Sequence, residues 1–247
     1  MSFKIRVIAA ILAVSASSCA WAQVNLATQG FTLTSNGPWS YWDGATLISD
    51  ANNVAKFSLT DFAKDANFSL NYDYDASNGN NVEAFYNVAA RAGYEISSIE
   101  YRGTLIGEVL PALAEPSSPY YTSEAGSASN HASSGLSVTG RGQATHQLDN
   151  FNGTTVFSLL SNAAPLTGSF NLNLWSSVYG NVSPGRWSFA DPQGSASGTV
   201  ASAASLRVVD PVLLISYARV SPVPEPASYA LMLGGLALLG VVRRRRS

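Results

Sequence analysis

The chain has 247 residues, of which 46% are hydrophobic and only 12% are charged, about half of the roughly 25% that is usual in soluble domains. This composition excludes a coiled coil, a charged disordered chain, a collagen-like repeat and a membrane protein with many spans. The formal net charge of -2 argues against a nucleic-acid binder, because such a protein needs an excess of basic side chains to neutralise phosphates.

The charge is distributed unevenly along the chain. Residues 23–221 hold fifteen of the 16 acidic residues and eight of the 14 basic ones, so this segment alone has a net charge of −7. The other basic residues lie near the two ends of the chain. Length and charge together predict one acidic folded domain at 23–221, between a leader at 1–22 and a tail at 222–247.

The leader has the three parts of a secretory signal peptide. Lys4 and Arg6 supply the positive start, residues 7–14 form the apolar run, and Ala20-Trp21-Ala22 fits the small-x-small cleavage pattern. Gln23 is therefore the expected first residue after cleavage. The pattern predicts export across the inner membrane by the Sec machinery.

Cys19 leaves a lipoprotein leader open as an alternative, although the residues before it lack the usual leucine. Cleavage after Ala22 removes this cysteine, which is the only one in the chain. The exported domain is then expected to fold without disulfide bonds.

An aromatic cluster formed by Trp39, Tyr41 and Trp42 lies near the start of the domain. Exposed aromatic rings offer flat apolar faces that can stack on sugar rings. The alternative is that these rings close one end of the hydrophobic core, where aromatic side chains are most often found. The cluster is a candidate glycan contact only if its rings are exposed.

Alternating apolar and polar residues predict β-strands through most of the domain. The clearest pattern covers 66–76, and shorter ones lie at 56–60, 169–174, 187–189 and 213–218. Turn-forming pairs separate these segments at Asn78-Gly79, Asn152-Gly153, Pro184-Gly185 and Asp191-Pro192. Many short strands with turns between them predict an all-β fold, an antiparallel β-sandwich of jelly-roll-like type.

Asp73, Asp75 and Ser77 place oxygen ligands two residues apart ahead of a glycine, as the start of a calcium-binding loop does. The glycine comes one position late and no glutamate closes the loop, so the alternative is the solvent-facing side of a strand. No other cofactor is expected, because His131 and His146 lack the spacing of a transition-metal site.

Three segments are harder to assign. Residues 82–90 have the apolar spacing of a helix. Residues 111–135 are rich in Pro, Ser and Ala and predict a long exposed loop. The small residues of 194–205 fit either a strand or a loop.

The sequence has no pattern typical of a catalytic nucleophile. It contains no Gly-x-Ser-x-Gly elbow, and the exported chain has no cysteine. His146 and Asp149 lie three residues apart, but serines are so abundant that a triad drawn from them means little. We therefore expect no enzymatic activity.

The tail has three consecutive parts. Val223, Pro224, Glu225 and Pro226 come first, and the prolines hold this segment extended. An uncharged apolar run over 227–242 predicts a single transmembrane helix of about 24 Å, slightly short of a hydrocarbon core of roughly 30 Å. By the positive-inside rule the final cluster places the C-terminus in the cytoplasm. This cluster consists of Arg243, Arg244, Arg245 and Arg246.

These three parts, in this order, resemble the PEP-CTERM sorting signal of Gram-negative bacteria, with Gly234-Gly235-Leu236 at the centre of the apolar run. The resemblance implies that an exosortase, an intramembrane cysteine peptidase, cuts near the Pro-Glu-Pro motif. It also implies association with exopolysaccharide and biofilm systems. A plain membrane anchor that is never cut is the alternative. Residues 92–96 resemble a strand start in other β-rich proteins with this tail, which favours a strand–turn–strand over a helix around 82–99.

The leader, domain and tail together predict an exported surface or extracellular-matrix protein. A single helix holds it transiently in the inner membrane, and it ends at the cell surface or outside the cell. Its expected partners are the Sec machinery, an exosortase and extracellular polysaccharide, and not nucleic acid. The alternative function is that of a secreted carbohydrate-active or calcium-dependent carbohydrate-binding β-sandwich.

Overall fold

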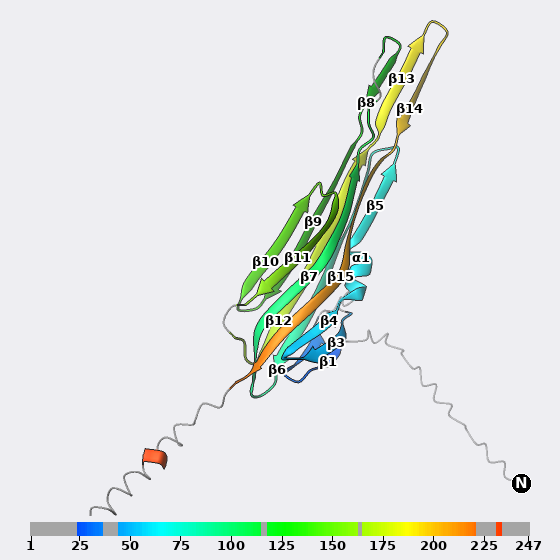
Figure 1. The fold of residues 1–247 in the computed structure, drawn as a ribbon. Coiled ribbons are helices and arrows are strands. Elements are labelled where there is room, and N and C mark those ends of the chain that lie inside the picture. The colour runs from blue at the N-terminus through cyan, green and yellow to red at the C-terminus, as the bar shows by residue number, and fades with distance from the viewer. Residues whose placement is uncertain (1–23, 37–43, 115–117, 163–164, 221–230, 234–247) are drawn as a thin grey trace, which may run out of the picture.

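The computed structural model describes residues 24–36, 44–114, 118–162, 165–220 and 231–233 (Figure 1). Nearly all of its regular structure is β-strand, and every strand pairing is antiparallel. This confirms the predicted all-β antiparallel fold. The predicted signal peptide at 1–22 and nearly all of the tail at 222–247 lie outside the described residues.

Two 6-stranded sheets form the main body of the described chain. Sheet A has the strand order β1 (Asn25–Ala27), β2 (Phe31–Ser35), β6 (Ala76–Ala90), β12 (Ser169–Ser183), β9 (Ser127–Val138), β10 (Gly142–Asp149). Sheet B has the order β11 (Gly153–Ser161), β7 (Tyr94–Leu110), β15 (Ser202–Arg219), β4 (Val54–Ser58), β3 (Thr46–Ala51), with β5 (Asn67–Tyr72) also paired to β15. In both sheets a late strand, β12 or β15, lies between strands that precede it in the chain.

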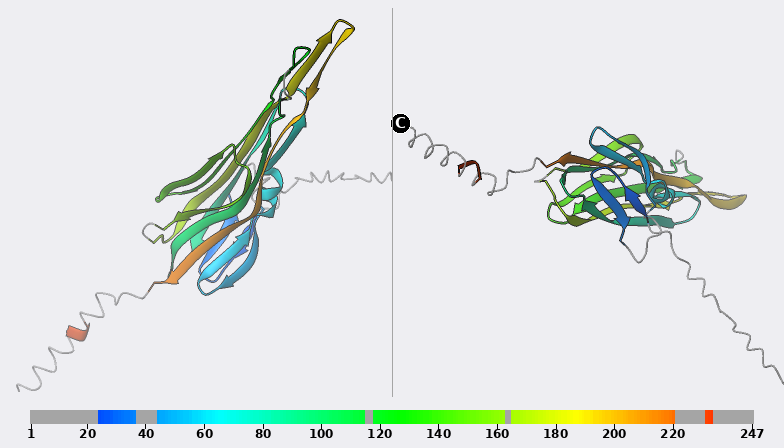
Figure 2. Two further views of the ribbon diagram at one scale, coloured as in Figure 1. Left: turned by 45° about the horizontal axis from the view of Figure 1, so that its top comes forward. Right: turned by 90° about the horizontal axis from the view of Figure 1, so that it is seen from below.

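A third, 3-stranded sheet extends the molecule at one end, as Figures 1 and 2 show. This sheet C consists of β14 (Gly194–Val200), β13 (Gly185–Asp191) and β8 (Tyr121–Glu124). A single residue separates β12 from β13, so the predicted turn at Pro184-Gly185 is only an interruption between two strands. The predicted turn at Asp191-Pro192 is confirmed, since Asp191 Oδ1 accepts hydrogen bonds of 2.8 Å from the backbone N–H groups of Gln193 and Gly194.

The hydrophobic core lies between sheets A and B. Leu172 and Leu174 of β12 and Leu213 and Ile215 of β15 belong to it, and none of them is more than 1% exposed. Each such side chain stabilises the fold by roughly 1.5–3 kcal/mol through burial of its apolar surface. The alternations that predicted strands over 169–174 and 213–218 are thus confirmed.

β15 changes its partner midway along its length. Its first part pairs with β5 and its second part with β4, while β7 follows it on the other side. A register shift lies between Val209 and Val212, where Asp210 has a φ of 49°. The short helix α1 (Thr60–Asp65), which the sequence did not predict, connects β4 to β5 beside this bulge.

Residues 82–99 form the end of β6, a turn and the start of β7, which confirms the strand–turn–strand prediction. The small residues of 194–205 likewise form strand, in β14 and the start of β15. The Asn152-Gly153 turn is also confirmed: it connects β10 to β11, and Gly153 has a φ of 123° that favours glycine.

The predicted long loop over 111–135 is wrong in its second half, which contains β8 and most of β9. The inward-facing residues of β9 include Asn130, Ala132 and Ser134, each at most 2% exposed. Because these side chains are small or polar, the sequence lacks the large apolar residues that normally mark a buried strand. Pairing with β12 and β10 on its two sides holds β9 in place instead.

The strand predicted over 66–76 is shorter than expected. β5 ends at Tyr72, and a bend separates it from β6. The Asn78-Gly79 pair does not form the predicted turn but lies inside β6, opposite β12. Close approach explains the glycine, because a Cβ at position 79 would lie 2.4 Å from the Cβ of Tyr179.

No helix within the described residues has the length and apolar character needed to cross a lipid bilayer. Only residues 231–233 of the transmembrane helix predicted over 227–242 are described.

The phenol of Tyr217 is buried and predicts that the fold loses stability at alkaline pH. Its O–H donates a hydrogen bond of 2.6 Å to Asp50 Oδ1, and its ring packs edge-on against Phe31 and Tyr94. Burial and, to a smaller extent, the Asp50 carboxylate raise the pKa of Tyr217 to about 12. In the unfolded chain a tyrosine ionises at about pH 10. The stability that this group contributes is therefore complete below pH 10 and is lost as the pH rises through 12.

We expect the free energy of unfolding to decrease as the pH rises above about 10, and to decrease less steeply in Tyr217→Phe. Urea titrations of the full-length chain at a series of pH values measure both slopes. Burial also raises the pKa of Tyr101, so part of the decrease persists in the variant. Equal slopes for the two proteins would contradict the role of Tyr217.

Candidate functional site

Most of the site residues predicted from the sequence lie outside the described residues. These are the cleavage residues Ala20, Ala22 and Gln23, the aromatic cluster Trp39, Tyr41 and Trp42, the motif Val223, Pro224, Glu225 and Pro226, and the basic cluster Arg243, Arg244, Arg245 and Arg246.

The three predicted calcium ligands are described. Asp73 lies in the bend after β5, Asp75 just before β6 and Ser77 at the start of β6. Asp75 lies 4.0 Å from Arg186 of β13, with both side chains exposed. The described residues contain no group of three or more His, Cys, Asp or Glu side chains arranged to hold a metal ion. Calcium binding at this bend stays a prediction.

The outer face of sheet A presents an aromatic ring laid flat on the sheet. Trp175 of β12 alternates with Leu174 and Ser176, which are fully buried, so its side chain points outward. A Cβ at Gly135 of β9, its register partner, would lie 1.8, 2.0 and 2.2 Å from three atoms of the indole ring. Because these three adjacent atoms lie at such similar distances, the indole turns its face to Gly135, and the side chain as a whole is of intermediate exposure.

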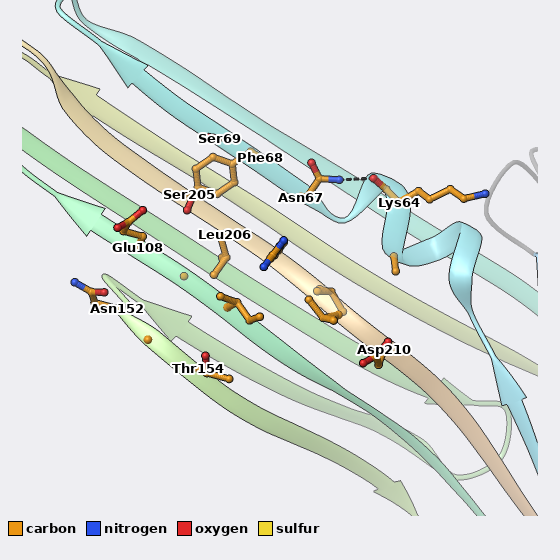
Figure 3. Close-up of a pocket in the computed structure, with 17 residues that line it drawn as sticks. Lys64, Asn67, Phe68, Ser69, Glu108, Asn152, Thr154, Ser205, Leu206 and Asp210 are labelled. Atoms are coloured by element: carbon orange, nitrogen blue, oxygen red, sulfur yellow. Dashed lines mark hydrogen bonds between the residues drawn. The ribbon is translucent and has the colours of Figure 1, made fainter.

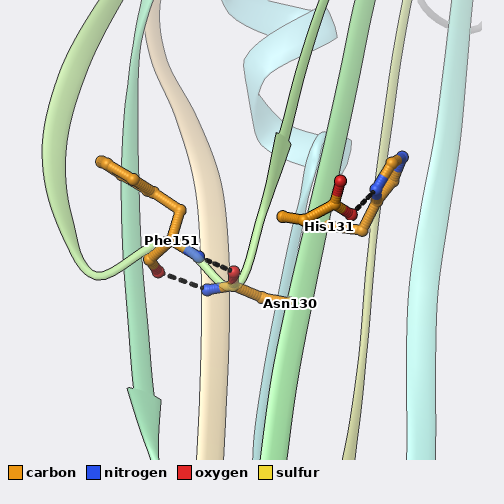
Figure 4. A network of polar contacts seen from close by, with 4 residues as sticks. Asn130, His131 and Phe151 are labelled. Atoms are coloured by element: carbon orange, nitrogen blue, oxygen red, sulfur yellow. Dashed lines mark hydrogen bonds and ion pairs between the residues drawn. The ribbon is translucent and has the colours of Figure 1, made fainter.

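A second ring lies farther along the same strand. Tyr179 is 48% exposed, and its ring packs on that of His131 of β9, with centroids 4.7 Å apart and planes tilted by 32°. His131 Nδ1 lies 2.5 Å from Asp149 Oδ1 of β10 (Figure 4). Trp175 and Tyr179 therefore both lean from β12 onto β9, and the His131–Asp149 pair supports the second ring.

Two shallow depressions border these rings. One, of about 280 Å³, is lined by Asn36, Phe85, Tyr86, Ser137, Thr139, Asn171, Leu172 and Asn173. The other, of about 480 Å³, is lined by Ser77, Asn78, Gly79, Asn80, Asn81, Ser177, Val178, Tyr179, Gly180 and Asn181. Neither lining contains Asp, Glu, Lys, Arg or His. On the outward side of β12, Trp175 therefore lies between the two asparagine-lined depressions.

Asparagine amides form a local network in the smaller depression. Asn171 Oδ1 accepts hydrogen bonds from the side-chain amides of Asn36 at 3.1 Å and Asn87 at 3.3 Å. The amide oxygen of Asn173 is buried and has no hydrogen-bond partner. An unpaired buried acceptor costs about 1–3 kcal/mol, and rotation of the Asn173 amide toward a donor would relieve this cost.

Sheet C contains a similar tryptophan. A Cβ at Gly198 of β14 would lie 2.6–2.8 Å from ring atoms of Trp187, its register partner on β13. Tyr121 of β8 stacks beside Trp187, with centroids 6.3 Å apart and planes 15° apart. Neither Trp187 nor Tyr121 lines any of the three cavities described in this section or the small one beside Arg141.

The outer face of sheet B carries a groove of about 890 Å³ (Figure 3). Residues 205–210 of β15 form its floor, and α1, β5, β7 and β11 form its sides. Its charges are mixed, with Lys64 and Arg207 against Glu108 and Asp210. The one aromatic residue in its lining, Phe68, is only 4% exposed. The groove thus offers little surface for ring stacking.

Asn130 of β9 is buried beneath this groove and ties several elements together (Figure 4). Its side-chain N–H groups donate to the carbonyl oxygens of Phe151 at 2.8 Å, Ser205 at 3.1 Å and Glu108 at 3.3 Å. Its amide oxygen accepts the N–H of Phe151 at 2.7 Å. One side chain of sheet A thereby holds β7, β15 and the β10–β11 turn.

The two histidines lie in different surroundings. His131 pairs with Asp149, whereas His146 stacks on Phe157 with its Nε2 atom buried and without a hydrogen-bond partner. Asp149 thus contacts His131, which lies directly opposite it on β9, and not His146 of its own strand. The absence of enzymatic activity stays a prediction.

The sequence predicts the strand that carries Trp175 but does not single out this residue as part of a site. The apolar residues 170, 172 and 174 assigned the buried side of β12, and the aromatic residue at 175 then falls on the solvent side. A large aromatic residue at a position where the alternation predicts a polar, solvent-facing one is a signal of a binding surface that the sequence does contain. The packing of Trp175 on Gly135 cannot be deduced from the sequence, because Gly135 lies forty positions earlier, in a segment that was predicted to be a loop.

Residues 222–246 match the family model of the PEP-CTERM protein-sorting motif, which confirms the resemblance of the tail. No curated protein and no solved structure matches the chain at a significant level. The motif indicates export toward the cell surface with an exosortase as the processing partner. The motif covers only the tail, so the role of the folded domain has to be inferred from the surface of that domain.

Proposed function

We propose that this protein, which carries a PEP-CTERM sorting motif, is cut by its exosortase near Pro224-Glu225-Pro226 and binds extracellular polysaccharide through the outer face of sheet A. The final location is the cell surface or the extracellular matrix. The predicted single-pass membrane helix over 227–242 holds the chain before cleavage. We also propose that sheets A and B form a jelly-roll-like sandwich.

The flat indole of Trp175 on Gly135 is the observation that carries the binding proposal. Sugar rings have apolar C–H faces and a polar rim of hydroxyl groups, so they stack on aromatic faces. The hydroxyl groups then need partners that both donate and accept hydrogen bonds, as asparagine amides do. Stacking surface and amides occur together on this face of the sheet.

We propose binding rather than catalysis at this face. Glycoside hydrolysis requires two carboxyl groups about 5–9.5 Å apart. The outward carboxylates of the face, Glu83 and Asp149, lie three strands and four residues apart in the register. With strands about 4.8 Å apart and about 3.4 Å per residue, this separation is about 20 Å, too far for the two groups to act on one bond.

Binding of the full-length protein, purified in mild detergent, to immobilised exopolysaccharide of its host tests the proposal. We expect Trp175→Ala to weaken binding about tenfold or more, because it removes the stacking surface. Trp187→Ala is the matched control, since it removes a tryptophan that also rests on a glycine, but in sheet C. Equal binding by Trp175→Ala and the unmodified chain, at unchanged thermal stability, would overturn the proposal.

A second variant tests whether the flat orientation of the indole, and not only its presence, is needed for binding. Gly135→Ala keeps Trp175 but places a Cβ within 1.8 Å of the indole, so the ring must leave the sheet surface. We expect this variant to lose most of the binding that Trp175→Ala loses. Full binding by Gly135→Ala would mean that the flat orientation of the ring is unimportant.

A further inference from the structure

We infer that the outer face of sheet A selects an uncharged glycan chain several sugars long, which lies along β12. This inference rests on the proposed function and specifies its ligand. It follows from the charges on the face, from the spacing of the two rings and from the direction in which they lean.

The charge of the face excludes an acidic polymer as its preferred ligand. The linings of the two depressions contain seven asparagines and no Asp, Glu, Lys, Arg or His. The ionisable groups beside the rings are Glu83, opposite Trp175, and the His131–Asp149 pair under Tyr179. No Lys or Arg is available in either depression to pair with a uronate, sulfate or phosphate group, and residues 23–221 as a whole have a net charge of −7.

The spacing of the rings sets the length of the ligand. Trp175 and Tyr179 are four residues apart on one strand and on one face, which corresponds to about 14 Å. The asparagines that border the face extend from Asn171 to Asn181, about 34 Å at the same rise per residue. A single sugar cannot contact both rings, so full affinity requires a chain.

The direction of the rings sets the path of the chain. Trp175 leans onto Gly135 and Tyr179 onto His131, and both of these partners lie on β9. The two stacking surfaces therefore form one row over the β12–β9 pair. A chain along this row passes Asn173 at one end and Asn181 at the other, each in the lining of one depression.

Competition with fragments of the host exopolysaccharide tests this inference. The polymer is partly hydrolysed, separated into neutral and acidic pools on an anion exchanger, and sized from one to about ten sugars. Each fraction then competes for binding of the full-length protein to the intact polymer. We expect neutral fragments to compete, with at least a tenfold gain in potency between single sugars and fragments of about six.

Variants connect the length dependence to the second ring. Tyr179→Ala is expected to remove most of the gain with length, because only one stacking surface remains. Tyr74→Ala is the matched control, since this tyrosine is 56% exposed but lies in the bend between β5 and β6. An unchanged length dependence in Tyr179→Ala would overturn the inference.

The outcomes for the inference and for the proposed function are distinct. Stronger competition by the acidic pool, or equal potency of single sugars and long fragments, overturns the inference while Trp175-dependent binding still supports the proposed function. Absence of binding to the intact polymer overturns both.

Discussion

Replacement of Pro224, Glu225 and Pro226 by alanine is expected to stop removal of the tail completely. The two prolines are expected to hold the segment before the apolar run extended, which is the conformation that a peptidase requires of its substrate. Alanines would allow the helix predicted over 227–242 to continue through the cleavage segment. Immunoblots of membrane and extracellular fractions of the native host should then show only full-length protein, in the membrane.

Pro119→Ala is the control for this experiment, because it removes a proline of the domain far from the motif in sequence. Normal size and release are expected for it. Release of the triple-alanine variant at the normal size would contradict exosortase processing at the motif. A full-length membrane form of the unmodified chain would instead favour the plain anchor that is never cut.

The tail and the strands were predictable from the sequence for different reasons. The tail is a linear signal whose parts are read in order, so no tertiary structure is needed to recognise it. Strands such as β12 and the second half of β15 were predictable because each buries one side, which leaves a period of two in the sequence. Their apolar residues, among them Leu172 and Ile215, lie in the core as that pattern requires.

The elements that were missed depend on contacts between distant residues. β9 buries Asn130, Ala132 and Ser134, which do not form an apolar alternation, and pairing with β12 determines its place. Asn78 and Gly79 have the local composition of a turn, but the close approach of β12 keeps them in a strand. Here tertiary contacts outweigh local preference.

The same reason explains why the candidate glycan surface was placed elsewhere by the sequence. An aromatic cluster is visible in a local stretch, as at 39–42, whereas the surface around Trp175 combines residues from β6, β9, β10 and β12. Whether a ring lies flat depends on the residue opposite it, and register cannot be deduced from one strand alone.

Asn130→Ala is expected to destabilise the fold by about 3–5 kcal/mol, which is a large effect for the loss of one buried polar side chain. The amide of Asn130 makes four hydrogen bonds, and its removal leaves the N–H of Phe151 and three carbonyl oxygens without this partner. Each buried group left unpaired costs about 1–3 kcal/mol, part of which relaxation of the turn recovers. Urea unfolding of the full-length chain measures the change, with exposed Asn181→Ala expected to stay within about 0.5 kcal/mol of the unmodified protein.

Asn130→Asp shows whether hydrogen bonding or mere volume is responsible. The aspartate fills the same space and still accepts the N–H of Phe151, but its second oxygen meets the carbonyl oxygens of Phe151, Ser205 and Glu108. Three oxygen–oxygen contacts replace three donated hydrogen bonds, and a buried charge is added, so this variant should be at least as unstable as Asn130→Ala. Protonation restores one donor, so we expect Asn130→Asp to recover part of its stability at low pH. A stable aspartate variant at neutral pH would contradict the role assigned to the amide as the donor that joins sheet A to β7 and β15.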